Sequence, residues 1–570
     1  MQNADIARIL NRLANMLDIE GANAFRVHAY RSAAQTIESH PRALQEMVTH
    51  DAPLTELDGI GRDLAEKITE LINTGRLTVL EEAEKRLPSG LLQLLRVSQL
   101  GPRRIRQLHE ALGIDSLETL KKAARDGRIR ALEGFGEKTE AGILKEAERL
   151  NDAPPRTRLD EAHRAADDLI AWLEHAKSAQ RLSAAGSLRR GRETVGDLDI
   201  LVSSEDGPAI MAHLMAYPEI AETVSHGKTK STLRLHSGLQ VDVRVVGDES
   251  FGAALYYFTG SRAHNIATRK MATDRGLRIN EYGVYKGKQQ LAGRTEEEVL
   301  AQIDLPWIPP ELRENRGEIE AALEGTLPEL VTLDDIRGDL HMHTTASDGK
   351  ASLEDMARAA KRRGYRYIAV TDHSQRLAMA NGLDARRLRE QMTEIDALNE
   401  RLKNFTVLKG NEVDILEDGS LDLPDDVLKA LDVCVFSIHS RFDLSREKQT
   451  ARILRAMDNP YVNILAHPTG RIINGREGYD VDMEAVLHGA KARGVFLEIN
   501  AQPARLDLAD HWARMARDIG VMLAINTDAH ATEQLGHMAL GVTQARRGGL
   551  ERQDVLNTRT VTQLRKLMKR

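Results

Sequence analysis

The spacing of apolar residues changes along the chain, and each spacing predicts a different kind of element. In the first 150 residues apolar side chains recur every three or four positions, as in 4–17 and 43–48, which is typical of amphipathic helices. Polar and apolar residues alternate in 239–246, which indicates a half-buried strand. We expect a helix at 158–175, then strands at 181–185, 198–202, 232–235 and 239–246.

Beyond residue 336 short apolar runs alternate with helical segments. Strands are expected at 336–340, 367–371, 405–409, 433–438, 461–465, 495–499 and 521–525. Helices are expected between them, at 353–362, 386–401, 446–457, 483–491 and 508–518. Alternation of strand and helix predicts a barrel of parallel strands with its functional residues at the strands' carboxyl ends.

Metal-type side chains follow these strands. One histidine at a strand end is more often structural than a ligand, but six of the nine histidines of this region lie at such ends. Three carboxylates join them, and the set is His341, His343, Asp348, His373, Glu412, His439, His467, Asp528 and His530. Imidazole mixed with carboxylate suits Zn²⁺, Mn²⁺ or Fe²⁺, and the set is large enough for up to about three ions.

A second candidate site lies in the middle of the chain. Asp197 and Asp199 are two residues apart in a predicted strand, so both project from one face and can hold divalent cations. The preceding Gly-Ser-Leu-Arg-Arg-Gly turn offers backbone N–H groups, the Ser187 hydroxyl and the Arg190 guanidinium to phosphate oxygens. Asp242, in a neighbouring predicted strand, is a candidate third ligand. Phosphoryl transfer needs this combination of carboxylate-bound metal and cationic donors.

Glycine turns open three of the predicted helices in the N-terminal region. Each resembles a helix-hairpin-helix, which presents free N–H groups to the DNA backbone without reading sequence. In the second copy Gln99 replaces the first glycine. One such turn is compatible with an ordinary helix junction, whereas three favour DNA binding. The glycines concerned are Gly59, Gly61, Gly101, Gly134 and Gly136.

The middle of the chain resembles the nucleotidyltransferase superfamily, and family X DNA polymerases in particular. The resemblance is carried by 186–202, by Asp242, by Tyr-Phe-Thr-Gly-Ser at 257–261 and by 275–283. It implies that Asp197, Asp199 and Asp242 are catalytic residues that bind Mg²⁺ or Mn²⁺. It also implies that the incoming nucleotide and its template meet Gly186, Ser187, Arg190, Gly196, Tyr257, Phe258, Gly260, Asn265 and Arg269.

The first hairpin and the segment 24–31 resemble the lyase domain of the same family. Lys67 then falls where the family keeps its Schiff-base lysine. A nucleophilic lysine needs a lowered pKa, from burial or from cationic neighbours, and Arg26, Arg31 and Arg62 are candidates. Asp63 replaces a second lysine often found near that site. The alternative reading of Lys67 is a solvated helix lysine.

The C-terminal region resembles the PHP domain, the polymerase and histidinol phosphatase family, whose metal motifs it matches without a gap. The expected fold is therefore multidomain, α+β and α/β: a helical hairpin domain, a nucleotidyltransferase palm with fingers and thumb-like subdomains, and a distorted TIM-like (β/α)7 barrel. The expected parts are 1–80 and 81–153 (helical), 154–247 (palm), 248–320 (nucleotide-selecting), 321–335 (linker) and 336–570 (PHP).

Composition limits the choices further. The 570 residues carry a net charge of −7, so nucleic-acid binding must depend on local patches. Cys434 is the only cysteine, which excludes an internal disulfide and fits a reducing cytosol. The N-terminus shows no signal-peptide pattern, and no apolar run approaches the ~20 residues that span a bilayer. We expect a cytoplasmic monomer without a membrane partner; protein partners are not predicted.

The resemblance implies a DNA polymerase that fills short gaps in repair and end joining, acting on gapped or nicked duplex and deoxynucleoside triphosphates. The PHP half would remove 3′ nucleotides as a metal-dependent 3′–5′ exonuclease. Cleavage at abasic sites and 5′-deoxyribose phosphate lyase activity are left open. Two alternatives remain: a nucleotidyltransferase for another substrate, and a DNA-binding scaffold whose metals are structural.

Overall fold

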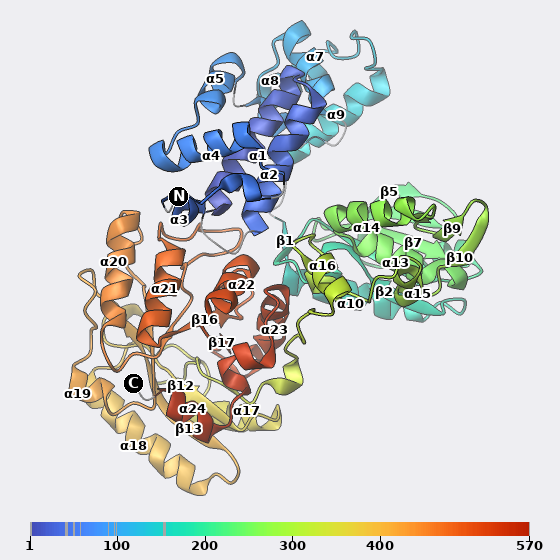
Figure 1. Ribbon diagram of the computed structural model, residues 1–570. Coiled ribbons are helices and arrows are strands. Elements are labelled where there is room, and N and C mark those ends of the chain that lie inside the picture. Colours follow the sequence, from blue (N-terminus) through green and yellow to red (C-terminus); the bar gives the residue numbers. More distant parts are fainter. Residues whose placement is uncertain are drawn as a thin grey trace. The chain divides into compact units, whose positions relative to one another are not determined.

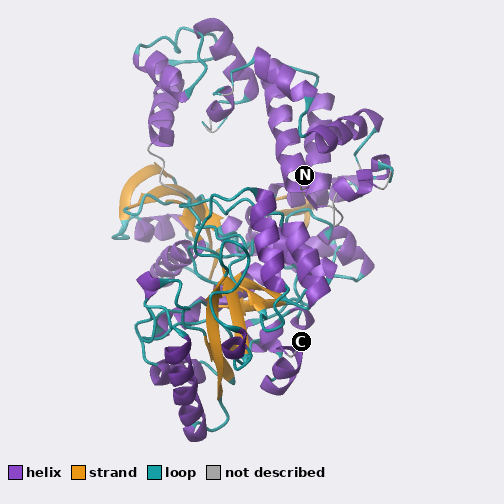
Figure 2. Ribbon diagram, turned by 90° about the vertical axis from the view of Figure 1, so that its left-hand side faces the viewer, coloured by secondary structure: helices purple, strands orange, loops and turns teal. Residues whose placement is uncertain are grey.

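The computed structural model describes residues 3–568 apart from 40–43, 50–51, 58, 89, 96, 98–99 and 152–155 (Figure 1). Gln99 lies outside the described residues. The chain forms two compact units, Met1–Pro155 and Arg156–Arg570. Every described strand belongs to the second unit (Figure 2). In the described part of the chain, no helix is both long and apolar enough to cross a bilayer.

The first unit is helical, as the apolar spacing predicts. Its helices pack around two apolar cores, the first containing Leu10 and Leu13 and the second containing Leu108 and Ile143. Apart from Ile19, which belongs to the second core, the two cores fall on either side of residues 84–90, close to the boundary expected after residue 80. The helices are α1 (Asn3–Glu20), α2 (Ala24–Ser39), α3 (Leu44–Thr49), α4 (Arg62–Thr74), α5 (Thr78–Arg86), α6 (Leu91–Leu94), α7 (Pro102–Leu112), α8 (Leu117–Arg125) and α9 (Glu137–Asn151).

The second unit begins with a five-stranded sheet in the order β2-β4-β7-β6-β5. β4 and β7 are parallel, and the other neighbours are antiparallel. Helices α10 (Leu159–Glu174) and α12 (Gly207–Leu214) pack on one face, and α13 (Phe251–Thr259) packs against Leu201 on the other. The strands are β2 (Arg181–Ala184), β4 (Asp197–Ser203), β5 (Ile220–His226), β6 (Lys230–Leu235) and β7 (Gln240–Val246), with a separate pair β1 (Thr157–Arg158) and β3 (Thr194–Val195).

A smaller subdomain follows and is fastened by a buried ion triad. Arg313 is fully buried and pairs with Glu296 at 2.7 Å, and Arg189 pairs with the same carboxylate at 2.7 Å. A shared buried carboxylate of this kind fixes the geometry of the elements that carry it, because losing one partner leaves a buried charge. The elements are α14 (Arg262–Asp274), β8 (Arg278–Asn280), β9 (Gly283–Lys286), β10 (Gln289–Ala292), α15 (Glu296–Ala301) and α16 (Glu318–Glu324).

The C-terminal region forms the predicted barrel. Seven parallel strands follow one another in chain order, and a parallel bridge between Met342 and Ala529 joins the first strand's end to the last. The strands are β11 (Gly338–Asp339), β12 (Tyr367–Val370), β13 (Thr406–Asp414), β14 (Val433–Ser437), β15 (Ile464–Leu465), β16 (Phe496–Asn500) and β17 (Leu523–Asn526). The helices are α17 (Leu353–Arg362), α18 (Ala385–Arg401), α19 (Asp425–Leu428), α20 (Arg446–Met457), α21 (Met483–Arg493), α22 (Asp510–Ile519), α23 (Met538–Arg547) and α24 (Val561–Met568).

The palm and the barrel are packed against each other within the second unit. Leu506, from the loop after β16, is fully buried in the apolar core of the palm. Arg471 of the barrel pairs with Glu193 of the palm at 2.7 Å. Near the palm's glycine turn, a Cβ on Gly191 would come within 2.2 Å of the Thr543 methyl group on α23. The two halves therefore share a close interface rather than a flexible tether.

Candidate active sites

The three predicted palm carboxylates lie together on neighbouring strands. β4 and β7 run parallel with Asp199 directly beside Asp242, and Asp197 lies two residues away on the same face of β4. Thr232 of β6 donates its hydroxyl to the Asp242 carboxylate and orients it. The register between β4 and β7 thus brings together carboxylates that are more than forty residues apart in sequence.

Burial and mutual repulsion both disfavour the charged form of two of these carboxylates. Burial and the charges of Asp197 and Asp242 raise the pKa of Asp199 to about 7. Burial and Asp242 also raise the pKa of Asp197. A bound cation relieves both effects, and an all-oxygen donor set suits Mg²⁺ or Mn²⁺. Among the described residues these carboxylates do not form a group whose ligand atoms all lie within 4.8 Å of one another, so their role as ligands stays a prediction.

The glycine turn lies against the carboxylates. Gly186 begins the short helix α11 (Gly186–Arg189) with φ +61°, and a Cβ there would come 2.5 Å from Asp199 Oδ2. A side chain is therefore excluded at this position both by strain and by space. Arg190 donates to the Thr259 carbonyl and pairs with Glu314 at 3.2 Å. The predicted contact of Arg190 with a triphosphate stays a prediction, because its guanidinium is already engaged here.

The residues predicted to face the nucleotide lie beside that arginine. Tyr257 and Phe258 are half-buried at the end of α13, and Gly260 follows with φ +71°. Asn265 on α14 donates to the Tyr257 carbonyl at 2.7 Å and fixes the turn. Three further predicted residues carry no side-chain contact that assigns them a role: Ser187 in α11, Gly196 before β4 and the exposed Arg269 on α14.

All nine predicted residues of the barrel converge at the carboxyl ends of the strands. Three groups have ligand atoms within 4.8 Å of one another. His343 and His373 each belong to two of them, so the groups form one continuous cluster. His467, outside these groups, lies 3.0 Å from a Glu412 oxygen. The groups are His343, Asp348, His373 and His530; His341, His343 and Asp528; and His373, Glu412 and His439.

The protonation of this cluster is set by its own members. Burial and the charge of His373 lower the pKa of His343 to about 4. Burial alone would lower the pKa of His373, but Glu412 and Asp348 outweigh it and raise that pKa to about 10. Burial would raise the pKa of Glu412, but His373 and His439 hold it well below its usual range. His373 and Glu412 therefore hold each other in their charged forms, whereas His343 is held neutral.

The donors fit a group of divalent ions. His341 Nε2, His343 Nδ1 and Glu412 Oε2 are buried and have no hydrogen-bond partner among the described residues. Buried polar atoms without partners are costly, and a metal would satisfy several at once. Nitrogen and carboxylate donors in these proportions suit Zn²⁺, Mn²⁺ or Fe²⁺.

Comparison with known proteins follows these divisions. Family models match at 1–77 (helix-hairpin-helix domain), 91–149 (SAM-like helix-hairpin-helix tandem), 254–314 (DNA polymerase beta thumb) and 339–502 (PHP domain). The DNA polymerase/3′-5′ exonuclease PolX of Bacillus subtilis (strain 168) is 41% identical over 574 residues, 100% of both chains. The chain belongs to the bacterial family X DNA polymerases with a C-terminal PHP domain. The chain is also 33% identical over 231 residues to a probable phosphatase of Thermoanaerobacter sp. (strain X514), covering 39% of this chain and 89% of that one.

This family X chain also contains site residues that the sequence did not single out. Glu498, fully buried in β16, accepts from His341 Nδ1 at 2.8 Å and from the His467 N–H at 2.8 Å. Asp414 lies 3.3 Å from His439 Nδ1. Carboxylates in this position orient a ligating histidine and fix its tautomer. The signal was a glutamate inside the apolar run Phe-Leu-Glu-Ile-Asn at 496–500.

In the first unit of this polymerase, the glycine turns take the positions that a helix-hairpin-helix requires. Gly61 and Gly101 immediately precede α4 and α7, and α9 begins directly after Gly136. Gly59 and Gly134 have φ +75° and +82°. A Cβ at Gly61, Gly101, Gly134 or Gly136 would meet nothing within 4 Å, which leaves the helix N-termini open to a phosphate.

Lys67 has a setting different from the one expected. Its amine pairs with Asp63, one turn earlier in α4. Two of the arginines proposed as neighbours carry acidic partners of their own, Arg62 with Glu66 and Arg31 with Asp18. An ion pair stabilises the protonated amine, whereas a nucleophile needs the neutral one. Lyase activity at Lys67 stays a prediction.

Proposed function

We propose that this chain fills short DNA gaps with its palm and removes 3′ nucleotides with its barrel. The observation that carries the proposal is the register of β4 and β7, which pairs Asp199 with Asp242, in a chain that also retains a complete cluster at the mouth of the barrel. Two separate clusters of metal-type residues support two separate phosphoryl-transfer reactions.

In the palm, the carboxylates would hold Mg²⁺ or Mn²⁺, which supplies charge neutralisation for phosphoryl transfer. The chain itself positions the substrate. Gly186 lets the turn approach the carboxylates, and the end of α13 provides Tyr257 and Phe258 beside the sugar. Asn265 holds the Tyr257 carbonyl, and so keeps the sugar-facing turn in place.

In the barrel, the cluster would hold up to about three ions, which polarise the phosphodiester and supply hydroxide near neutral pH. Glu498 and Asp414 orient His341 and His439, so that their free ring nitrogens face the cluster. The helix N-termini at Gly61, Gly101 and Gly136 would hold the DNA backbone without sequence preference. Gapped or nicked duplex in the bacterial cytosol is the proposed substrate.

One labelled substrate tests both halves. A gapped duplex with a 5′-labelled primer is incubated with and without deoxynucleoside triphosphates, in Mg²⁺ and in Mn²⁺. Extension in the first case and shortening by single nucleotides in the second are expected. Asp199→Ala should abolish extension and leave shortening intact. An Asp199→Ala protein that still extends the primer would exclude the palm site, and a wild type that never shortens it would leave the barrel as a scaffold.

A further inference from the structure

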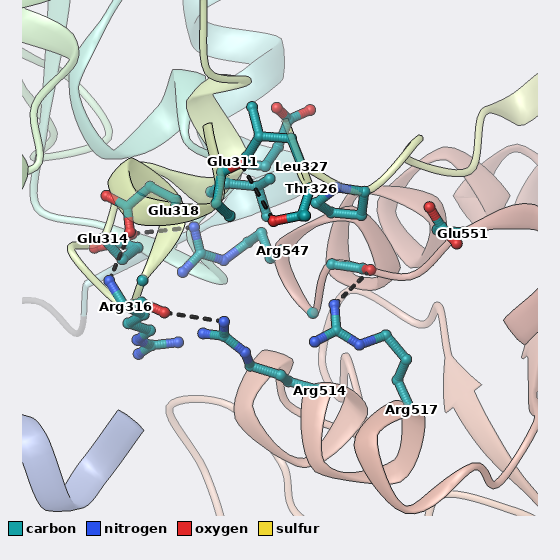
Figure 3. Close-up of a pocket in the computed structure, with 16 residues that line it drawn as sticks. Glu311, Glu314, Arg316, Glu318, Thr326, Leu327, Arg514, Arg517, Arg547 and Glu551 are labelled. Carbon is teal, nitrogen blue, oxygen red and sulfur yellow. Dashed lines mark hydrogen bonds and ion pairs between the residues drawn. The ribbon is translucent and has the colours of Figure 1, made fainter. Parts of the chain in front are cut away.

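A cavity of about 290 Å³ lies between the polymerase subdomain and the barrel (Figure 3). One part of its wall comes from residues 311–328 and the other from residues 514–551. Neither the palm carboxylates nor the histidine cluster lines it. Because both halves contribute, a ligand bound there would contact the two enzymes of the chain at once.

The carboxylates that line this cavity already have their own partners. Glu311 pairs with Arg546 at 2.7 Å, and Glu314 pairs with Arg547 at 3.1 Å. Glu318 accepts from His264 at 2.7 Å. Glu551 accepts from the Glu329 N–H at 2.9 Å. Arginines therefore compensate Glu311 and Glu314, whereas Glu318 and Glu551 accept from a histidine and from a backbone N–H.

Arg514 lines the same cavity. Its guanidinium donates to the Arg316 carbonyl at 2.9 Å, but among the described residues no carboxylate oxygen lies within 4.0 Å of it. Burial and the charge of Arg517 lower the pKa of Arg514. Arg517 donates to the Gly549 carbonyl at 2.8 Å and lines the same hollow. Arg517 also pairs with Asp518 at 2.6 Å, so Arg514 is the guanidinium of the two that a small anion would stabilise.

The rest of the wall is less polar. Figure 3 shows Thr326 and Leu327 across the hollow from Arg514 and Arg517, and Ala321 and Pro328 line it as well. A ligand that suits both sides carries an anionic group at one end and a flat or apolar group at the other. The volume is close to the lower limit of small-molecule sites, about 300 Å³, which favours one nucleotide over two.

We propose that this cavity binds a nucleoside monophosphate, with its phosphate at Arg514 and Arg517 and its base against Leu327 and Pro328. Planar guanidiniums bind phosphate oxygens in pairs. The choice of a nucleotide rests on the proposed nuclease function, because that reaction would release nucleoside monophosphates from the barrel, which also forms one wall of the cavity. The presence of an anion site does not rest on that function.

The test is binding of deoxyadenosine monophosphate to the full-length, metal-loaded protein, measured by equilibrium dialysis. The wild type should bind one equivalent of deoxyadenosine monophosphate. The affinity of Arg514→Met for it should be at least ten-fold lower, and that of Arg514→Lys should be intermediate. Arg386→Met is the matched control, because Arg386 is exposed and, in the described part of the chain, forms its ion pair with Glu390 on its own helix. Deoxyadenosine, inorganic phosphate and pyrophosphate are compared as probes.

Location is checked with 8-azido-deoxyadenosine monophosphate, followed by peptide mapping. Crosslinks to 311–328 are expected. Equal affinity for deoxyadenosine monophosphate in wild type and Arg514→Met, or crosslinks confined to the strand ends, would overturn the site. Phosphate or pyrophosphate binding as tightly as the nucleotide would overturn the assignment to a nucleotide. If instead the proposed nuclease function is wrong, the wild-type protein will release no nucleotide from DNA but will still bind deoxyadenosine monophosphate in the cavity.

Discussion

Replacing Asp199 by asparagine should stabilise the metal-free protein while it abolishes synthesis. The folded pKa of Asp199 is about 7 against an ordinary 3.8, net of the attraction of Arg244 and Arg190. At ~1.4 kcal/mol per unit, ionising this carboxylate in the folded state costs up to about 4 kcal/mol. We halve this to about 2 kcal/mol because the group is not fully buried and the palm can relax. Asparagine keeps the shape and removes the charge.

The sign of the pH dependence follows from the raised pKa. The folded state binds the proton more tightly than the unfolded state, so this carboxylate costs nothing below pH 4, and its cost grows as pH rises from about 4 to about 7. The advantage of Asp199→Asn should therefore be absent near pH 4 and complete at pH 8. For a cooperative unit as large as Arg156–Arg570, about 2 kcal/mol corresponds to a rise of roughly 2 °C in melting temperature.

The assay is thermal unfolding of both proteins in EDTA at pH 5 and pH 8, repeated in Mg²⁺. Magnesium should stabilise the wild type preferentially, because it binds the folded carboxylates, and so reduce the difference. Asp168→Asn, an exposed acid on α10, is the control and should change little. If Asp199→Asn melts at or below the wild-type temperature in EDTA at pH 8, the ionised Asp199 carboxylate does not destabilise the metal-free protein, and the reasoning is refuted.

Three further predictions concern the interface and the other two sites. Arg547 is 6% exposed and donates to the Arg190 carbonyl at 2.6 Å. Arg547→Met should therefore lower the free energy of unfolding, measured in urea titrations, by roughly 3 kcal/mol, and should raise the KM for nucleotide more than it slows the nuclease. Equal losses in both activities would contradict a local role. Replacing His341 and His343 together by alanine should abolish 3′ shortening and reduce bound transition metal, with primer extension kept; full shortening activity would refute the cluster. If Lys67 is the lyase nucleophile, borohydride should trap the protein on 5′-deoxyribose phosphate DNA and Lys67→Ala should lose most of that adduct; equal trapping would move the chemistry to another amine.

The barrel was predictable because its strands are buried on both faces. Continuous apolar runs such as 433–438 mark such strands without reference to neighbours, and the polar residue after each run falls at the same end of the barrel. The palm strand β5 was missed for the opposite reason. It is an edge strand, most of whose side chains are exposed, so its sequence lacks the alternation that burial imposes.

Contacts between distant segments were the part that the sequence could not supply. Glu314 pairs with Arg190 across more than a hundred residues, and no local pattern relates the two. Asp63 is visible beside Lys67 in the sequence, but the ion pair between them depends on side-chain geometry. The role of Glu498 depends on His341, which follows the first strand of the barrel and lies 157 residues away in sequence. The local spacing of apolar residues identifies the helices and strands, whereas the ion pairs between charged side chains depend on how those elements pack in the folded protein.

Leu506 has a consequence for attempts to divide the gene. Its side chain belongs to the barrel in sequence but is fully buried in the apolar core of the palm. A fragment that stops before residue 336 would carry an empty, apolar socket on its surface, and isolated polymerase halves should aggregate unless that socket is filled or made polar. Transplanting the palm onto another nuclease would meet the same obstacle, so a workable exchange between relatives has to carry the loop 501–508 along with the palm.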